Sequence, residues 1–143
     1  MIRILGLVVI LFFVFNYGYK VFLIRGDSMN PSMNNLEMVV VDKLSYDMEA
    51  PQYRDVIVFY DYVYDEYVIK RVVGLPGDLI EIKDGEIYRN NILYIDEFTY
   101  MRVANDNTQP LVIWEGEYWV IGDNRNDTWY GVIYEEEIVG KLN

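Results

Sequence analysis

The chain has 143 residues, 52% of them hydrophobic and 16% aromatic, which is enough for one domain with a modest core. Its formal net charge of −11 argues against nucleic acid as a partner, because such a surface repels phosphate backbones. It contains neither cysteine nor histidine, which excludes disulfides, thiolate chemistry, Ser-His-Asp triads and histidine metal sites. A nucleophilic serine would therefore need another base, and lysine is the recognised substitute.

The N-terminal segment is an uninterrupted apolar run over residues 4–15. Extended to about Phe22, with Lys20 reaching the interface, it approaches the roughly 20 residues that span a bilayer. A cleaved signal peptide is disfavoured because no A-x-A-like pair of small residues follows, and a buried core helix because the run has no polar face. We predict one retained transmembrane helix in an anchor of residues 1–24, followed by a β-rich domain of residues 25–143.

The remainder is rich in Val, Ile and Tyr and predicts short strands separated by turns. Asp84-Gly85 is a strong signal for a two-residue hairpin, and residues 104–110 indicate an exposed loop. The fold class expected is mostly β, a folded antiparallel sheet or small barrel. The expected strands cover residues 37–42, 55–60, 66–73, 79–83, 86–88, 92–95 and 117–121.

A serine in a turn-prone setting follows the apolar segment, in residues 25–33. Gly26 and Asp27 favour a tight bend, and Pro31 prevents a helix from continuing through the stretch. Ser28 is thus presented on irregular backbone, where its hydroxyl could meet a substrate. A serine in such a turn is more often a solvated turn residue, so this pattern alone does not assign a role.

Lys70 differs from the other lysines because it lies in an apolar strand, within residues 67–73. Burial disfavours the ammonium form and lowers the pKa. A fall of about three units from about 10.4, equivalent to roughly 4 kcal/mol, would make the free amine abundant at neutral pH. The alternative is that Lys70 points to solvent from an edge strand and protects it from aggregation.

Three segments in order together resemble bacterial type I signal peptidases of the Gram-positive branch. They are Gly26-Asp-Ser-Met-Asn-Pro-Ser32, Lys70-Arg-Val-Val-Gly-Leu-Pro-Gly-Asp78 and Gly122-Asp-Asn-Arg125. These enzymes are membrane-bound Ser-Lys endopeptidases that remove signal peptides from exported proteins. These three segments are called the first, second and third box below. The resemblance extends over essentially the whole chain, including the apolar segment before the first box.

The resemblance implies a role for each matching residue. Ser28 would be the nucleophile and Lys70 its general base, and the Ser28 amide would contribute to the oxyanion hole. Gly26 stands where some members carry a hydroxyl that adds a second oxyanion donor, and the Thr128 hydroxyl could orient the Lys70 amine. The remaining matched residues would hold the loops that align the dyad: Arg71, Gly77, Asp78, Asp123 and Arg125.

The resemblance also implies the substrate, its binding site and the location. The signal peptide of a preprotein would add as an extended strand, with its small side chains in shallow pockets lined by Ile24, Met29, Met33 and Ile69. No metal or other cofactor would be required. The catalytic domain would lie on the extracytoplasmic side of the cell membrane, close to the lipid bilayer.

The third box departs from the family after Arg125. The usual Asp-Ser-Arg stretch is replaced by Tyr130-Gly-Val132, so a supporting charge pair is expected to be absent. This departure keeps open a non-proteolytic homologue that serves as an assembly or chaperone factor, for instance in surface-fibre biogenesis. A soluble self-cleaving repressor is disfavoured, because an apolar run stands where its DNA-binding domain would be.

Overall fold

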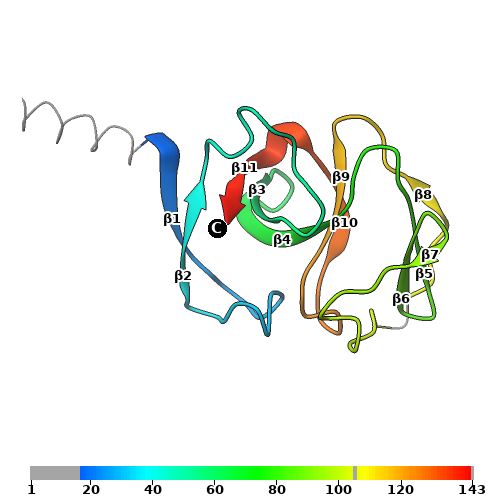
Figure 1. Cartoon of the computed structure of the whole chain (residues 1–143). Coiled ribbons are helices and arrows are strands. Elements are labelled where there is room, and N and C mark those ends of the chain that lie inside the picture. Colours follow the sequence, from blue (N-terminus) through cyan, green and yellow to red (C-terminus); the bar gives the residue numbers. More distant parts are fainter. Residues whose placement is uncertain (1–16, 105, 143) are drawn as a thin grey trace, which may run out of the picture.

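The computed structural model describes residues 17–104 and 106–142, which form two antiparallel sheets and a short 3-10 helix, η1 (Glu135–Glu137) (Figure 1). The larger sheet has the strand order β1-β2-β11-β3-β4-β9-β10, and the smaller sheet, at the right of Figure 1, has the order β7-β6-β5-β8. The strands are β1 (Tyr19–Leu23), β2 (Met38–Asp42), β3 (Val56–Asp61), β4 (Glu66–Gly74), β5 (Leu79–Lys83), β6 (Glu86–Arg89), β7 (Ile92–Leu93), β8 (Leu111–Val112), β9 (Glu117–Ile121), β10 (Tyr130–Tyr134) and β11 (Ile138–Leu142).

Residues 70–74 of β4 and 118–121 of β9 are buried on both faces, because they separate two hydrophobic cores. Successive side chains of a strand point to opposite faces. Val72 and Val120 therefore pack in one core, with Ile57, Phe59, Tyr118 and Ile133. Val73 and Trp119 pack in the other, against the side chains of the smaller sheet. This two-sided burial matches the apolar sequence of residues 72–73 and 118–121, whereas Glu66, Lys70 and Arg71 interrupt the apolar pattern of β4.

Strand β4 is paired differently along its two halves. Its residues Glu66 to Arg71 pair with β3, whereas β9 pairs only with Arg71, Val72 and Gly74. Within the described part of the chain, residues 66–70 therefore have a strand neighbour on one side only. Their second edge is open.

The predicted hairpin and most predicted strands are confirmed. Asp84 and Gly85 both have positive φ, 51° and 75°, as a tight two-residue hairpin turn requires. The strand expected at residues 92–95 is shorter, Ile92–Leu93.

Four strands were not predicted: β1, β8, β10 and β11. Gly131 and Gly140 weaken the strand signal of β10 and β11 when these stretches are read alone. In the fold, a Cβ on Gly140 would lie 2.3 Å from the backbone oxygen of Asp42, so the close approach of β11 to β2 requires this glycine.

The predicted anchor covers residues 1–24, and its first 16 residues, with the apolar run 4–15, lie outside the described residues. In the part that is described, no helix is both long and apolar enough to cross a bilayer. The end of the expected anchor has a different structure. Residues 19–23 form β1 and pair along their whole length with β2, so this stretch belongs to the larger sheet.

Candidate active site

Ser28 and Lys70 both line one cavity of about 380 Å³. Glu66, Val68 and Lys70 all line it, because alternate residues of β4 point to the same face. Ser28 enters from the loop between β1 and β2. The opposite wall comes from the segment after β9, which includes Trp129.

The two side chains at the centre of the cavity are in direct contact. Lys70 Nζ donates a hydrogen bond of 2.8 Å to Ser28 Oγ and another of 3.1 Å to the Ile69 carbonyl oxygen. Lys70 is only 4% exposed, whereas Ser28 is partly open to the cavity. A neutral amine at this position could accept the Ser28 proton along the same line.

Burial lowers the pKa of Lys70 from 10.5 to about 8. The cause is desolvation of the ammonium form in an apolar strand. The carboxylates of Asp123 and Glu66 act in the opposite direction and limit the fall. Because Lys70 is buried and faces the cavity, the alternative that it points to solvent is wrong.

The loop after β9 holds the backbone of the Ser28 loop. The Asn124 amide N–H donates to the Ser28 carbonyl oxygen at 3.0 Å, and the Asn124 side chain donates to the Asp27 carbonyl oxygen at 3.2 Å. A Cβ on Gly122 would lie 2.3 Å from the Ser28 carbonyl oxygen, so the loops approach this closely only with glycine there. Gly26, at the other end of the Ser28 turn, has φ of +91°.

Two buried ion pairs support these loops. Arg71 binds Asp123 through both carboxylate oxygens at 2.7 Å, and the Ser32 hydroxyl also donates to Asp123. Arg125 pairs with Asp96. The sequence departure at residues 130–132 thus leaves neither arginine without a carboxylate partner.

Thr128 does not contact the Lys70 amine as expected. Its hydroxyl accepts a hydrogen bond from Gly122 N at 3.1 Å and donates to the Trp129 carbonyl oxygen at 3.0 Å. No hydrogen bond joins it to Lys70, although both residues line the cavity. Thr128 therefore fastens the loop that carries Asp123, and the amine is oriented by Ser28 and the Ile69 carbonyl.

The four residues expected to form the substrate pockets do not line this cavity. Ile24 and Met29 are buried, at 4% and 2% exposure, and Met33 is partly buried. Ile69 alternates with Val68 and Lys70, so its side chain points to the other face of β4. Their role in binding substrate stays a prediction.

Sequence reasoning missed several residues of the site, among them Glu66, Val68 and Trp129 in the cavity lining and Asn124 and Asp96 in the supporting loops. Asn124 lies in the third box, and its amide side chain is of a kind that bridges loop backbones, so the sequence did contain a signal for its role. Trp129 follows Thr128, which was already assigned to the site, whereas Asp96 had no signal because only the fold brings it to Arg125. Within residues 17–104 and 106–142, no group of acidic residues is placed to hold a metal ion.

Replacing Lys70 with methionine should stabilise the protein at pH 7. The folded-state pKa of about 8 lies below the unfolded value of 10.5, so the unfolded chain keeps the proton between these values. Burial of the charged Lys70 amine lowers the stability of the folded state by its full amount below pH 8, and this loss disappears as the pH rises towards 10.5. We expect Lys70→Met to raise the free energy of unfolding by about 1–3 kcal/mol at pH 7, after loss of the hydrogen bond to Ser28. Urea unfolding at pH 7 and pH 10 measures this gain, which should shrink at pH 10. A gain that the exposed Lys83→Met control reproduces would contradict it.

Replacing Asp123 with asparagine should destabilise the protein strongly. The change leaves the buried Arg71 guanidinium without its counter-charge, and breaking such a pair costs about 3–5 kcal/mol. Asp127→Asn, an exposed change in the same loop, should stay within about 0.5 kcal/mol of the parent. Urea unfolding at pH 7 compares the two variants, and equal effects would show that the pair is not what holds the loop.

Comparisons with known proteins agree with this geometry. The family model described as "Signal peptidase, peptidase S26" matches residues 1–143. Signal peptidase IB of Staphylococcus aureus is 33% identical over 156 aligned residues, covering 94% of this chain and 81% of that protein. The chloroplastic thylakoidal processing peptidase 1 of Arabidopsis thaliana is 29% identical over 133 residues, covering 82% and 39%. The crystal structure of a signal peptidase I from Enterococcus faecalis V583 superposes with a TM-score of 0.52 at 28% identity, covering 66% of this chain and 98% of that one. The chain therefore belongs to the signal peptidase family, peptidase S26.

Proposed function

We propose that the protein is a serine endopeptidase of the signal peptidase I type, which removes N-terminal signal peptides from exported preproteins. The observation that carries the proposal is the 2.8 Å contact between Ser28 Oγ and the buried Lys70 amine inside an open cavity. Family membership supports the same reaction class.

In the proposed reaction, Ser28 is the nucleophile and Lys70 the general base. Neutral Lys70 takes the Ser28 proton as Oγ attacks the scissile carbonyl carbon, and it then gives that proton to the leaving amine. A water that loses its proton to Lys70 hydrolyses the resulting ester and frees Ser28. The Ser28 N–H makes no hydrogen bond to another described residue, so it is available to the oxyanion.

The open edge of β4 offers a binding mode for an extended substrate. Residues 66–70 lack a strand on one side, next to Ser28, so a substrate segment would add there as an antiparallel or parallel strand. Val68 and Trp129 line the cavity next to Ser28, so apolar side chains would suit the positions beside the scissile bond. The family resemblance favours small side chains there.

An exposed apolar face supports a location beside the membrane. Val21 pairs with Val40 and Leu23 with Met38 across β1 and β2, and all four side chains are exposed. Directly opposed residues of two strands share a face, so these four form one apolar patch. Together with the apolar run of the predicted anchor, residues 4–15, the patch favours a single-pass protein whose catalytic domain touches the extracytoplasmic leaflet.

The alternative of a non-proteolytic assembly factor loses its main support. It rested on the altered residues Tyr130 to Val132, which belong to strand β10 and pair regularly with β9. The substitution therefore leaves the sheet and the Ser28–Lys70 contact in place.

The dyad predicts which variants stop cleavage. The full chain in detergent should cleave a preprotein that carries an A-x-A site, and Ser28→Ala and Lys70→Ala should each lower the rate by at least about 10³-fold. Ser45→Ala and Lys83→Ala are matched controls outside the cavity and should retain the parent rate. Gel analysis of the processed preprotein measures the rates, and full activity of Lys70→Ala would rule out the dyad.

The rate should depend on pH through Lys70. Only the neutral amine accepts a proton, so kcat/KM should rise with pH through a midpoint near 8. The Glu66 carboxylate raises the pKa of Lys70, so Glu66→Gln should move the midpoint to lower pH, and added salt should reduce the displacement. Glu49→Gln, an exposed change outside the cavity, should leave the midpoint unchanged. A profile with the same midpoint in Glu66→Gln and the parent would show that this carboxylate does not tune Lys70.

A further inference from the structure

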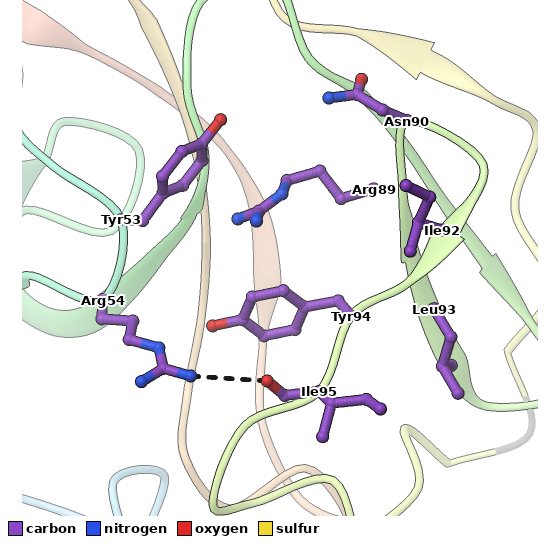
Figure 2. A pocket seen from close by; sticks show the side chains of 8 residues that line it. All are labelled: Tyr53, Arg54, Arg89, Asn90, Ile92, Leu93, Tyr94 and Ile95. Carbon is purple, nitrogen blue, oxygen red and sulfur yellow. Dashed lines mark hydrogen bonds between the residues drawn. The ribbon is translucent and has the colours of Figure 1, made fainter.

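A second cavity, of about 320 Å³, lies between the segment before β3 and strands β6 and β7. It shares no lining residue with the cavity at Ser28. Two arginines, Arg54 and Arg89, face it together with Tyr53 and Tyr94, and Figure 2 shows the two guanidinium groups on either side of the Tyr94 ring (Figure 2). A pair of cations around one cavity is unexpected in a chain with a net charge of −11.

Neither arginine has an acidic partner within the described part of the chain. The ion pairs found there use Arg71, Lys83, Arg102, Arg125 and Lys141. Arg89 is instead held by aromatic rings, with its guanidinium carbon 3.9 Å from the Tyr53 ring centre and 5.1 Å from the Tyr94 ring centre. Aromatic stacking fixes the position of a guanidinium group without neutralising its charge.

Most of the N–H groups of the two arginines remain available. A guanidinium group carries five, of which Arg89 uses one for the Val73 carbonyl oxygen at 3.2 Å. Arg54 uses one for the Ile95 carbonyl oxygen at 3.5 Å. Asp78 accepts no hydrogen bond from either arginine. Its oxygens accept from the Tyr53 hydroxyl, the Asn90 amide and the Leu75 N–H.

Tyr94 supplies an independent sign of a missing ligand. It is 7% exposed, and its hydroxyl is the one buried side-chain oxygen or nitrogen of the described residues without a hydrogen-bond partner. Figure 2 shows the hydroxyl directed towards Arg54, which is close enough to affect the Tyr94 pKa but can only donate, so the hydroxyl proton has no acceptor. Buried polar groups are almost always satisfied in folded proteins, so an orphan hydroxyl that lines a cationic cavity points to an acceptor that binds there.

We propose that this cavity binds a phosphate group, held by Arg54, Arg89 and the Tyr94 hydroxyl. Guanidinium groups match the oxygens of phosphate in geometry and charge, and three donors from different directions suit a tetrahedral oxyanion. Ile92 and Ile95 are exposed at the rim and would contact an apolar portion of the ligand. The phosphate is therefore either a free ion or part of a lipid headgroup. The proposal is independent of the proposed peptidase activity.

Binding is tested with the full chain in a neutral detergent, using inorganic phosphate against chloride at equal ionic strength. Phosphate should raise the midpoint of thermal unfolding. Arg54→Gln should weaken phosphate binding about tenfold or more, because it removes charge-assisted hydrogen bonds. Tyr94→Phe should raise the midpoint without phosphate, since it removes an unsatisfied hydroxyl, and should still reduce the response to phosphate.

Arg102→Gln is the matched control, because it removes the same charge from an exposed arginine outside this cavity. It should respond to phosphate as the parent does. A second arm reconstitutes the parent, Arg54→Gln and Arg102→Gln in vesicles of phosphate-free digalactosyldiacylglycerol with and without phosphatidylglycerol. A response to inorganic phosphate assigns a free ion, and one to phosphatidylglycerol alone that Arg54→Gln removes assigns a lipid headgroup. The proposal is overturned if neither probe stabilises the parent, or if Arg102→Gln loses as much response as Arg54→Gln.

Discussion

The desolvation of one ammonium group is the constraint around which this domain is arranged. Lys70 is useful as a base only where water cannot stabilise its charged form, so β4 must be covered on the face that carries it. Covering that face requires the Ser28 loop on one side and the loop after β9 on the other. Both loops are irregular, and irregular backbone keeps its position only when its polar groups are satisfied.

Two buried ion pairs help to hold these loops in position. Arg71 is the residue after Lys70, and its bidentate contact with Asp123 joins β4 to the loop that also holds the Ser28 backbone through Asn124. The same carboxylate accepts from Ser32, so the three boxes of the sequence meet at one buried group. A single Asp thus links the strand that carries Lys70 to the loop that carries Ser28. Its negative charge also keeps the Lys70 pKa from falling further.

Much of the fold and of the candidate site could be predicted from the sequence, wherever the local pattern and the chemistry agree. The apolar strand around Lys70, the Asp84-Gly85 hairpin and the absence of histidine are properties of neighbouring residues or of composition. The strands β10 and β11 were missed because glycines that permit close packing also weaken a strand signal. Thr128 was assigned to Lys70 by its place in a motif, but the loop geometry turns its hydroxyl to Gly122. The pairing of Arg125 with Asp96 joins residues 29 positions apart and leaves no local trace.

The half-paired strand β4 also bears on how selective such an enzyme can be. A peptide that completes the larger sheet is held through its own amides and carbonyls, which are the same in every sequence. Recognition by main chain imposes few demands on side chains, apart from those that enter the cavity beside Ser28. One catalytic domain can then serve many unrelated clients, with discrimination concentrated in the few residues that flank the bond to be cut.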